Sequence, residues 1–195
     1  MQNATGSVEY GLGRLIALQG GVPENEYRFR RIRELVIPNT RSLLQTFRDS
    51  KLSLVFLTYG SRRPDYSDLP PGLREFCELT NNRVGEVEYD IVADIAPLEG
   101  EVVINKRSVS PFTTTDFDAV LASLHAHVLV FCGVSTDVCV EHAVRDAADR
   151  GYACIVVSDA CGATSPEDDE AGLRSMRNYG HVTETDCIVA GLASI

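Results

Sequence analysis

The stretch VLVFCGVSTDVCV, residues 128–140, decides the fold class. Its first four residues are apolar and form a run of strand length, which ends at Cys132-Gly133. A helical pattern then runs from about residue 136 to residue 150 and carries Cys139 in its first turn. A buried strand that enters an amphipathic helix through a short turn is the repeating unit of parallel α/β sheets.

The same alternation extends over most of the chain. Other predicted strands occupy residues 52–59, 101–106 and 154–157, and residues 182–190 form a last strand with a short helix. Amphipathic helices separate them, so we expect a single domain over residues 1–195, a three-layer α/β/α fold with a mostly parallel, Rossmann-like sheet. The polar, proline-rich residues 61–100 predict a long loop.

The composition of the chain argues against two kinds of partner, nucleic acids and membranes. The chain has 28 acidic and 18 basic residues, a formal net charge of −10, which speaks against a nucleic-acid partner. No apolar run reaches the 18 or so residues of a membrane span and no signal peptide opens the sequence, so we expect a cytoplasmic protein without a membrane partner.

Cys139 stands apart from the other cysteines. No Cys-x-x-Cys pair occurs, and the remaining thiols are expected to be reduced: Cys77, Cys132, Cys154, Cys161 and Cys187. At a helix start the free N–H groups and the helix dipole favour a thiolate, which is the nucleophilic form of the residue. The same N–H groups can receive an oxyanion. The alternative is a cysteine that only packs in the helix.

Lys106 ends the predicted strand 101–106 at its carboxyl end, the edge at which parallel sheets bind ligands. There it could stabilise the thiolate by its charge and help with the leaving group. The alternative is an ordinary solvated lysine.

Two segments carry a family resemblance: GVSTDVCVEHAVRDAADRGY at residues 133–152, followed by VSDACGA at 157–163, and VVINKRSVSPFTTTDFDAVL at 102–121. They resemble the isochorismatase-like cysteine hydrolases, in the amidohydrolase branch. The resemblance implies that Cys139 is the nucleophile and Lys106 a triad lysine. It further implies a cis Val134–Ser135 peptide, with the amides of Ser135 and Cys139 as oxyanion hole.

The resemblance also implies a six-stranded sheet, a homodimer or homotetramer, and a small-molecule amide substrate. The expected pocket residues are Gln2, Tyr59 and Phe112. The family's third catalytic residue is an aspartate at the end of its first, mid-sheet strand, just before a Met-Gln pair. Here that pair is Met1-Gln2, so we expect this strand and its aspartate to precede Met1, with an ordinary initiator methionine as the alternative.

Metal-binding members of the family carry histidines in the loop that here reads TYGSRRPDYSD, residues 58–68, without histidine. We therefore expect neither a metal nor another cofactor. The acids at 167–170 are predicted to be solvated at a helix start. The arginines at 28, 30, 31 and 33 are predicted to be solvated too, with a subunit contact or a carboxylate substrate as alternatives.

The expected reaction is hydrolysis of a carbon–nitrogen amide bond in a small carbamoyl, ureido or amide substrate through an acyl-enzyme. Two alternatives stay open. One is a catalytically silent family member with a binding or oligomer-forming role, and the other is a redox-active thiol protein in which Cys132 or Cys161 resolves Cys139.

Overall fold

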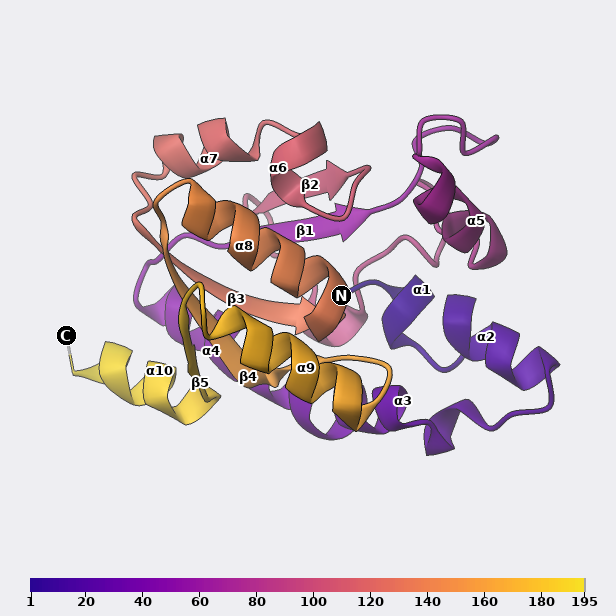
Figure 1. The fold of residues 1–195 in the computed structure, drawn as a ribbon, viewed down its shortest axis with the longest axis horizontal. Helices are drawn as coiled ribbons and strands as arrows, with labels where there is room; N and C mark the ends of the chain where they lie inside the picture. The colour runs from indigo at the N-terminus through magenta and orange to yellow at the C-terminus, as the bar shows by residue number, and fades with distance from the viewer. Residues whose placement is uncertain (195) are drawn as a thin grey trace.

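The computed structural model describes residues 1–194 as an α/β protein in which every pairing between named strands is parallel (Figure 1). Two strands form one sheet, in the order β1-β2, and three form another, in the order β3-β4-β5. The strands are β1 (Val55–Tyr59), β2 (Val102–Lys106), β3 (Val128–Val134), β4 (Ala153–Gly162) and β5 (His181–Thr183).

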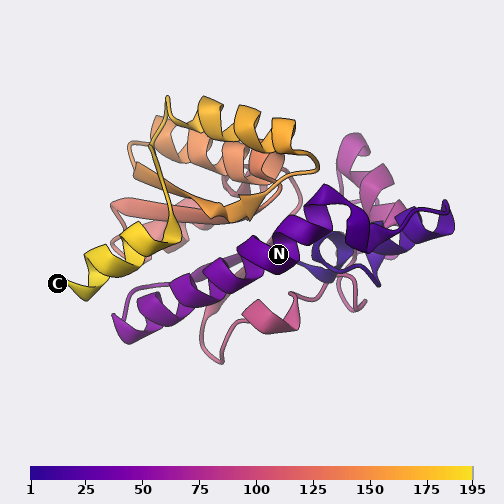
Figure 2. The same cartoon turned by 90° about the horizontal axis from the view of Figure 1, so that it is seen from below.

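Helices cover both faces of the larger sheet. In Figure 2, α8 (Glu141–Asp149) and α9 (Pro166–Met176) lie on one side of β3 and β4, while α4 (Ile37–Asp49) and α10 (Thr185–Ala193) lie on the other. The three-layer α/β/α prediction is therefore confirmed. The other helices and helical turns are α1 (Asn3–Gly6), α2 (Gly11–Leu18), η1 (Pro23–Asn25), α3 (Tyr27–Arg31), η2 (Ile32–Val36), α5 (Pro71–Leu79), η3 (Ala93–Ile95), α6 (Pro111–Thr114), α7 (Phe117–Ser123) and η4 (Thr136–Val140).

The core lies between these layers. Val144 and Ala147 of α8 are fully buried against Val156 and Cys161 of β4 and against Met176 of α9. This matches the apolar spacing of α8 in the sequence, because residues three and four apart share one face of a helix. A smaller cluster on the opposite face joins Leu43 of α4 to Val157 and Ala160 of β4.

The long loop predicted for residues 61–100 contains regular structure, which corrects the prediction. Helix α5 begins with Pro71 at its first turn and buries Cys77, and the short turn η3 follows at 93–95. Proline is well tolerated in the first turn of a helix, where its missing N–H costs no hydrogen bond. The proline-rich composition therefore concealed a helix start.

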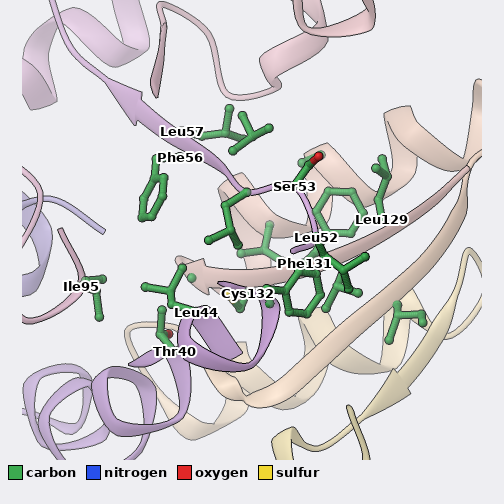
Figure 3. Close-up of a pocket in the computed structure, with 18 of the residues that line it drawn as sticks. Thr40, Leu44, Leu52, Ser53, Phe56, Leu57, Ile95, Leu129, Phe131 and Cys132 are labelled. Atoms are coloured by element: carbon green, nitrogen blue, oxygen red, sulfur yellow. The ribbon is translucent and has the colours of Figure 1, made fainter. Parts of the chain in front are cut away.

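A groove separates the two sheets. Within residues 1–194, β1 pairs only with β2 along its length and β3 only with β4, so one edge of each remains open. A cavity of about 760 Å³ lies between these edges, lined largely by apolar side chains of β1, β3 and α4 (Figure 3). Labelled examples are Leu57, Leu129, Phe131 and Leu44. The sequence resemblance implied one sheet of six strands, whereas residues 1–194 form five strands, two in one sheet and three in the other.

Candidate active site

The turn after β3 positions Cys139. The peptide bond between Val134 and Ser135 is cis, as the resemblance implied, and the π-helical turn η4 starts immediately afterwards. Gly172 of α9 packs directly against this turn, because a Cβ at that position would lie 3.0 Å from the Cα of Asp137. The close packing of α9 therefore requires glycine at position 172. This packing holds the turn in place.

Lys106 lies beside the thiol, at the carboxyl end of β2. Its ammonium group is 3.4 Å from Cys139 Sγ, and it donates hydrogen bonds to the carbonyl oxygens of Ser108 (3.0 Å) and Val109 (2.7 Å). Only 4% of the residue is exposed. The two carbonyls orient the ammonium group, and the structure thus brings together the two residues that the sequence placed 33 positions apart.

Tyr59 completes this part of the site from the end of β1. It pairs in register with Lys106, whose Nζ lies 5.3 Å from the centroid of the tyrosine ring. A cation over an aromatic face is a favourable contact. Burial raises the pKa of Tyr59 well above its ordinary value, so the phenol stays neutral at physiological pH. Tyr59, Lys106 and Cys139 all line the large cavity.

Gln2 also lines the cavity, but its side chain is fully engaged in holding the N-terminal segment. Its Oε1 accepts from the Tyr59 amide (2.9 Å), and its Nε2 donates to the Tyr89 carbonyl (2.7 Å) and to Asn82 Oδ1 (3.3 Å). Phe112 does not line the cavity within the described chain. It lies in the core, edge-to-face with Phe117.

Arg28 is the main residue that sequence reasoning placed wrongly. It was predicted to be solvated, yet it is only 4% exposed. Its Nε donates to the Thr5 carbonyl (2.9 Å) and its Nη1 to Ser135 Oγ (2.8 Å), next to the cis peptide. The apolar neighbours Phe29 and Ile32 gave a signal that this short helix has a buried face.

Asp169 corrects the prediction that the acids at 167–170 are solvated. It is buried and accepts from the Tyr27 hydroxyl (2.7 Å), pairs with Arg31 (2.9 Å) and bonds to the hydroxyl of Thr136. Burial first, and then this carboxylate, raise the pKa of Tyr27 to about 12. Asp169 therefore ties α9 to α3 and to Thr136, the first residue of η4.

Asp137 lies beside this network in the turn itself. Its Oδ1 is buried and has no hydrogen-bond partner in residues 1–194, and burial raises the pKa of its carboxyl group. It is thus an acidic group of the turn with one carboxylate oxygen that accepts no hydrogen bond from the described residues.

All six cysteines are free thiols. Burial raises the pKa of Cys77 to about 12 and also raises the pKa of Cys154 and of Cys161, which keeps these three protonated. Cys139 is half-buried and Cys132 and Cys187 are exposed. Among the described residues no three His, Cys, Asp or Glu side chains gather where a metal ion could bind, and no helix is long and apolar enough to cross a membrane.

Comparison with solved structures supports the fold. A cysteine hydrolase from Pseudomonas syringae pv. phaseolicola superposes with a TM-score of 0.75 at 25% identity, over 82% of this chain and 80% of that one. The N-carbamoylsarcosine amidase of Thermoplasma acidophilum gives a TM-score of 0.65 at 27% identity, over 77% and 83% of the two chains.

Sequence comparison gives relatives of the same kind. The ureidoacrylate amidohydrolase RutB of Serratia proteamaculans is 35% identical over 112 residues, 56% of this chain and 45% of that protein. The aligned part of the chain thus spans about half the length of this curated relative. The family model for the isochorismatase domain matches residues 28–187, which include β1 to β5, Lys106 and Cys139. The chain belongs to the isochorismatase domain family.

Proposed function

We propose that the protein is a cysteine-nucleophile hydrolase that cleaves a carbon–nitrogen amide bond in a small carbamoyl- or ureido-type molecule. The observation that carries this is the buried Lys106 ammonium 3.4 Å from Cys139 Sγ, at the helical start that follows β3. The relatives named as amidohydrolase and amidase support it, although the alignment with the amidohydrolase covers only 45% of that protein.

In the first step the Cys139 thiolate attacks the substrate carbonyl carbon. A C–S bond forms, and the π electrons of the carbonyl move to its oxygen. Backbone N–H groups of Ser135 and Cys139 would receive this oxyanion, because the first N–H groups of a helical turn lack intrahelical partners. The Lys106 ammonium, 3.4 Å from Sγ, stabilises negative charge on and near the sulfur during the attack.

In the second step the C–N bond breaks and the leaving nitrogen takes up a proton. Water then attacks the acyl-enzyme carbonyl, the C–S bond breaks, and the thiolate returns with release of the acid product. The leaving nitrogen therefore needs a general acid. Asp137 is close in sequence to Cys139 but belongs to the same turn, which places it poorly for this role.

The family resemblance assigns this acid to an aspartate at the end of a further strand, and the groove between β1 and β3 is the place in the described chain that such a strand would fit. Two open, parallel strand edges face the groove, and each unpaired buried backbone group costs about 1–3 kcal/mol. A further parallel strand in this groove would satisfy both edges and bring its last side chain near Cys139.

Ammonia release from a panel of small amides, carbamoyl compounds and ureides tests the function. It should be measured for the 195-residue chain and for a form that carries an N-terminal strand ending in aspartate. Turnover should require Cys139, so Cys139→Ser abolishes it, and it should rise about 10²–10⁴-fold with the extension. No turnover by either form, with intact folding, would favour the catalytically silent alternative. Equal turnover by both forms would show that another residue carries the proton.

A further inference from the structure

We propose that Arg28 is a positioning residue for the oxyanion hole: its guanidinium fixes Ser135, whose backbone amide is one of the proposed oxyanion donors. The inference rests on the proposed function and adds a residue that acts through another one rather than on the substrate. It is carried by the hydrogen bond from Arg28 Nη1 to Ser135 Oγ, which joins α3 to the start of η4 over 107 positions of sequence.

Ser135 anchors the turn that carries the nucleophile, because it occupies the N-cap position of η4. Its carbonyl oxygen accepts hydrogen bonds from the N–H groups of Val138 (3.3 Å) and Val140 (3.1 Å). Among the described residues, it accepts none from Cys139, which lies between these two. The orientation of Ser135 therefore determines where the first N–H groups of the turn point.

The Ser135 hydroxyl does not perform the usual task of a serine at an N-cap. A capping serine generally accepts a hydrogen bond from the second or third N–H of its helix. Within the described chain the Ser135 side chain makes no such bond and instead accepts from Arg28, at 2.8 Å. An N–H group that the cap does not occupy stays available to an anion. Arg28 thus holds Ser135 in place and keeps its hydroxyl away from the turn.

Arg28 is itself held in a fixed orientation. Only 4% of the residue is exposed, and its Nε donates to the Thr5 carbonyl (2.9 Å), so two hydrogen bonds fix the plane of the guanidinium. Burial lowers the pKa of Arg28, whereas the nearby carboxylates of Asp137 and Asp169 favour its charged form. Within residues 1–194 Arg28 does not line the large cavity. A role through Ser135 therefore fits its position better than contact with a substrate.

A neighbour of Arg28 on α3 fastens the next residue of the turn. Tyr27 donates to Asp169 (2.7 Å), which also accepts from the hydroxyl of Thr136. Two side chains of α3 thus reach consecutive residues of the turn, one directly and one through α9. A preorganised donor needs no reorganisation when charge develops, and a displacement of about 1 Å can cost about 10²-fold in rate. Loss of the direct contact should therefore slow the step that forms the oxyanion.

Two reagents separate the oxyanion from the reactivity of the thiol. Iodoacetamide alkylates Cys139 by displacement of iodide, and no charge develops on a carbonyl oxygen. The ester p-nitrophenyl acetate is attacked at its carbonyl carbon: the C–S bond forms, the carbonyl oxygen takes up the negative charge, and then the C–O bond to the nitrophenyl group breaks. Because p-nitrophenolate leaves as an anion, this acylation needs no general acid and is measurable on the 195-residue chain.

We expect Arg28→Met to lower the ratio of the acylation to the alkylation rate constant at Cys139 at least about tenfold. Ser135→Ala, which removes the hydroxyl but keeps the amide, should lower the ratio as much. The double variant should lose no more than either single one, because both changes break the same contact. Arg30→Met, an exposed change on the same helix, is the matched control and should leave the ratio unchanged.

An unchanged ratio in Arg28→Met, including equal slowing of both reactions, overturns the inference, since Arg28 then affects only the thiol or the fold. Additive losses in the double variant overturn it as well, because Arg28 would then not act through Ser135. If Arg28→Met does not fold, as judged by thermal melting, Ser135→Ala decides alone. A loss of at least about tenfold in its ratio supports the inference, and a wild-type ratio overturns it.

A second measurement uses an amide that the ammonia-release panel identifies. Arg28→Met should lower kcat at least about tenfold and change KM less than about threefold, because the oxyanion exists only after attack. Acylation of wild-type Cys139 together with an unchanged ratio refutes the role of Arg28 and leaves the proposed function standing. Alkylation of wild-type Cys139 without any acylation counts against the proposed function itself, and the inference falls with it.

Discussion

Replacing Lys106 by methionine should make Cys139 a far poorer nucleophile. Methionine has a similar unbranched length but no charge, so it removes the ammonium group 3.4 Å from Sγ. At an effective dielectric constant of about 20, unit charges at this separation interact by about 5 kcal/mol. Water beside the half-buried thiol weakens this interaction. Even about 1.4 kcal/mol, less than a third of it, corresponds to a tenfold change in the rate constant of attack by the sulfur.

The assay is the rate of iodoacetamide labelling of Cys139 at pH 7, followed by peptide mass spectrometry. We expect Lys106→Met to slow it at least about tenfold. Lys51→Met is the matched control, because Lys51 is exposed and is the only other lysine of the chain. Lys106→Arg, which keeps the charge but not the compact ammonium geometry, should fall between.

Loss of the two hydrogen bonds to Ser108 and Val109 could also loosen the site, so thermal melting of each variant is measured alongside. If Lys106→Met melts like the wild type and still labels within about threefold of its rate, then Lys106 does not activate Cys139. The catalytic assignment of this lysine would then be wrong.

Four further outcomes are expected. Cys139 should be labelled first among the six thiols under sub-stoichiometric iodoacetamide, and earlier labelling of Cys132 would contradict the site. Asp169→Asn should lower the free energy of unfolding in urea by about 1–3 kcal/mol, because it removes the charge partner of the half-buried Arg31 and weakens the hydrogen bonds from Tyr27 and Thr136; a loss below about 1 kcal/mol would show that the network is dispensable. The hydrogen bonds from Arg48 lower the pKa of Glu101 although the carboxyl group is partly buried. The pair therefore stabilises the folded protein fully above about pH 4.3, the ordinary pKa of glutamate, and this contribution is lost as the pH falls through the lowered pKa. Glu101→Gln should therefore lower the free energy of unfolding by about 1–2 kcal/mol at pH 7, and by less when unfolding is measured at acidic pH. Activity should survive exhaustive chelation, and loss of one equivalent of metal together with activity would place the protein in another branch of its family.

Local patterns in the sequence were enough to predict the architecture and the strand–turn–helix segment that carries Cys139. Parallel strands buried on both faces read as continuous apolar runs, and the helix that follows β3 is set by its own spacing. The contact between Lys106 and Cys139 was also predictable, because parallel strands place their carboxyl ends at one edge. Each of these features depends on residues that are neighbours in sequence or repeat with a fixed period.

Only the tertiary structure decided which charged residues are buried. Arg28 and Arg30 are alike in sequence and two positions apart, yet one lies against Thr5 and Ser135 and the other is exposed. Asp169 is buried because partners from α3 and η4 converge on it, and these are far away in sequence. The free energy of a buried charge depends on what other segments bring within hydrogen-bonding distance, and no local period encodes that. The open edges of β1 and β3 were likewise decided only by the tertiary structure, because the packing of the whole sheet determines which strands are neighbours.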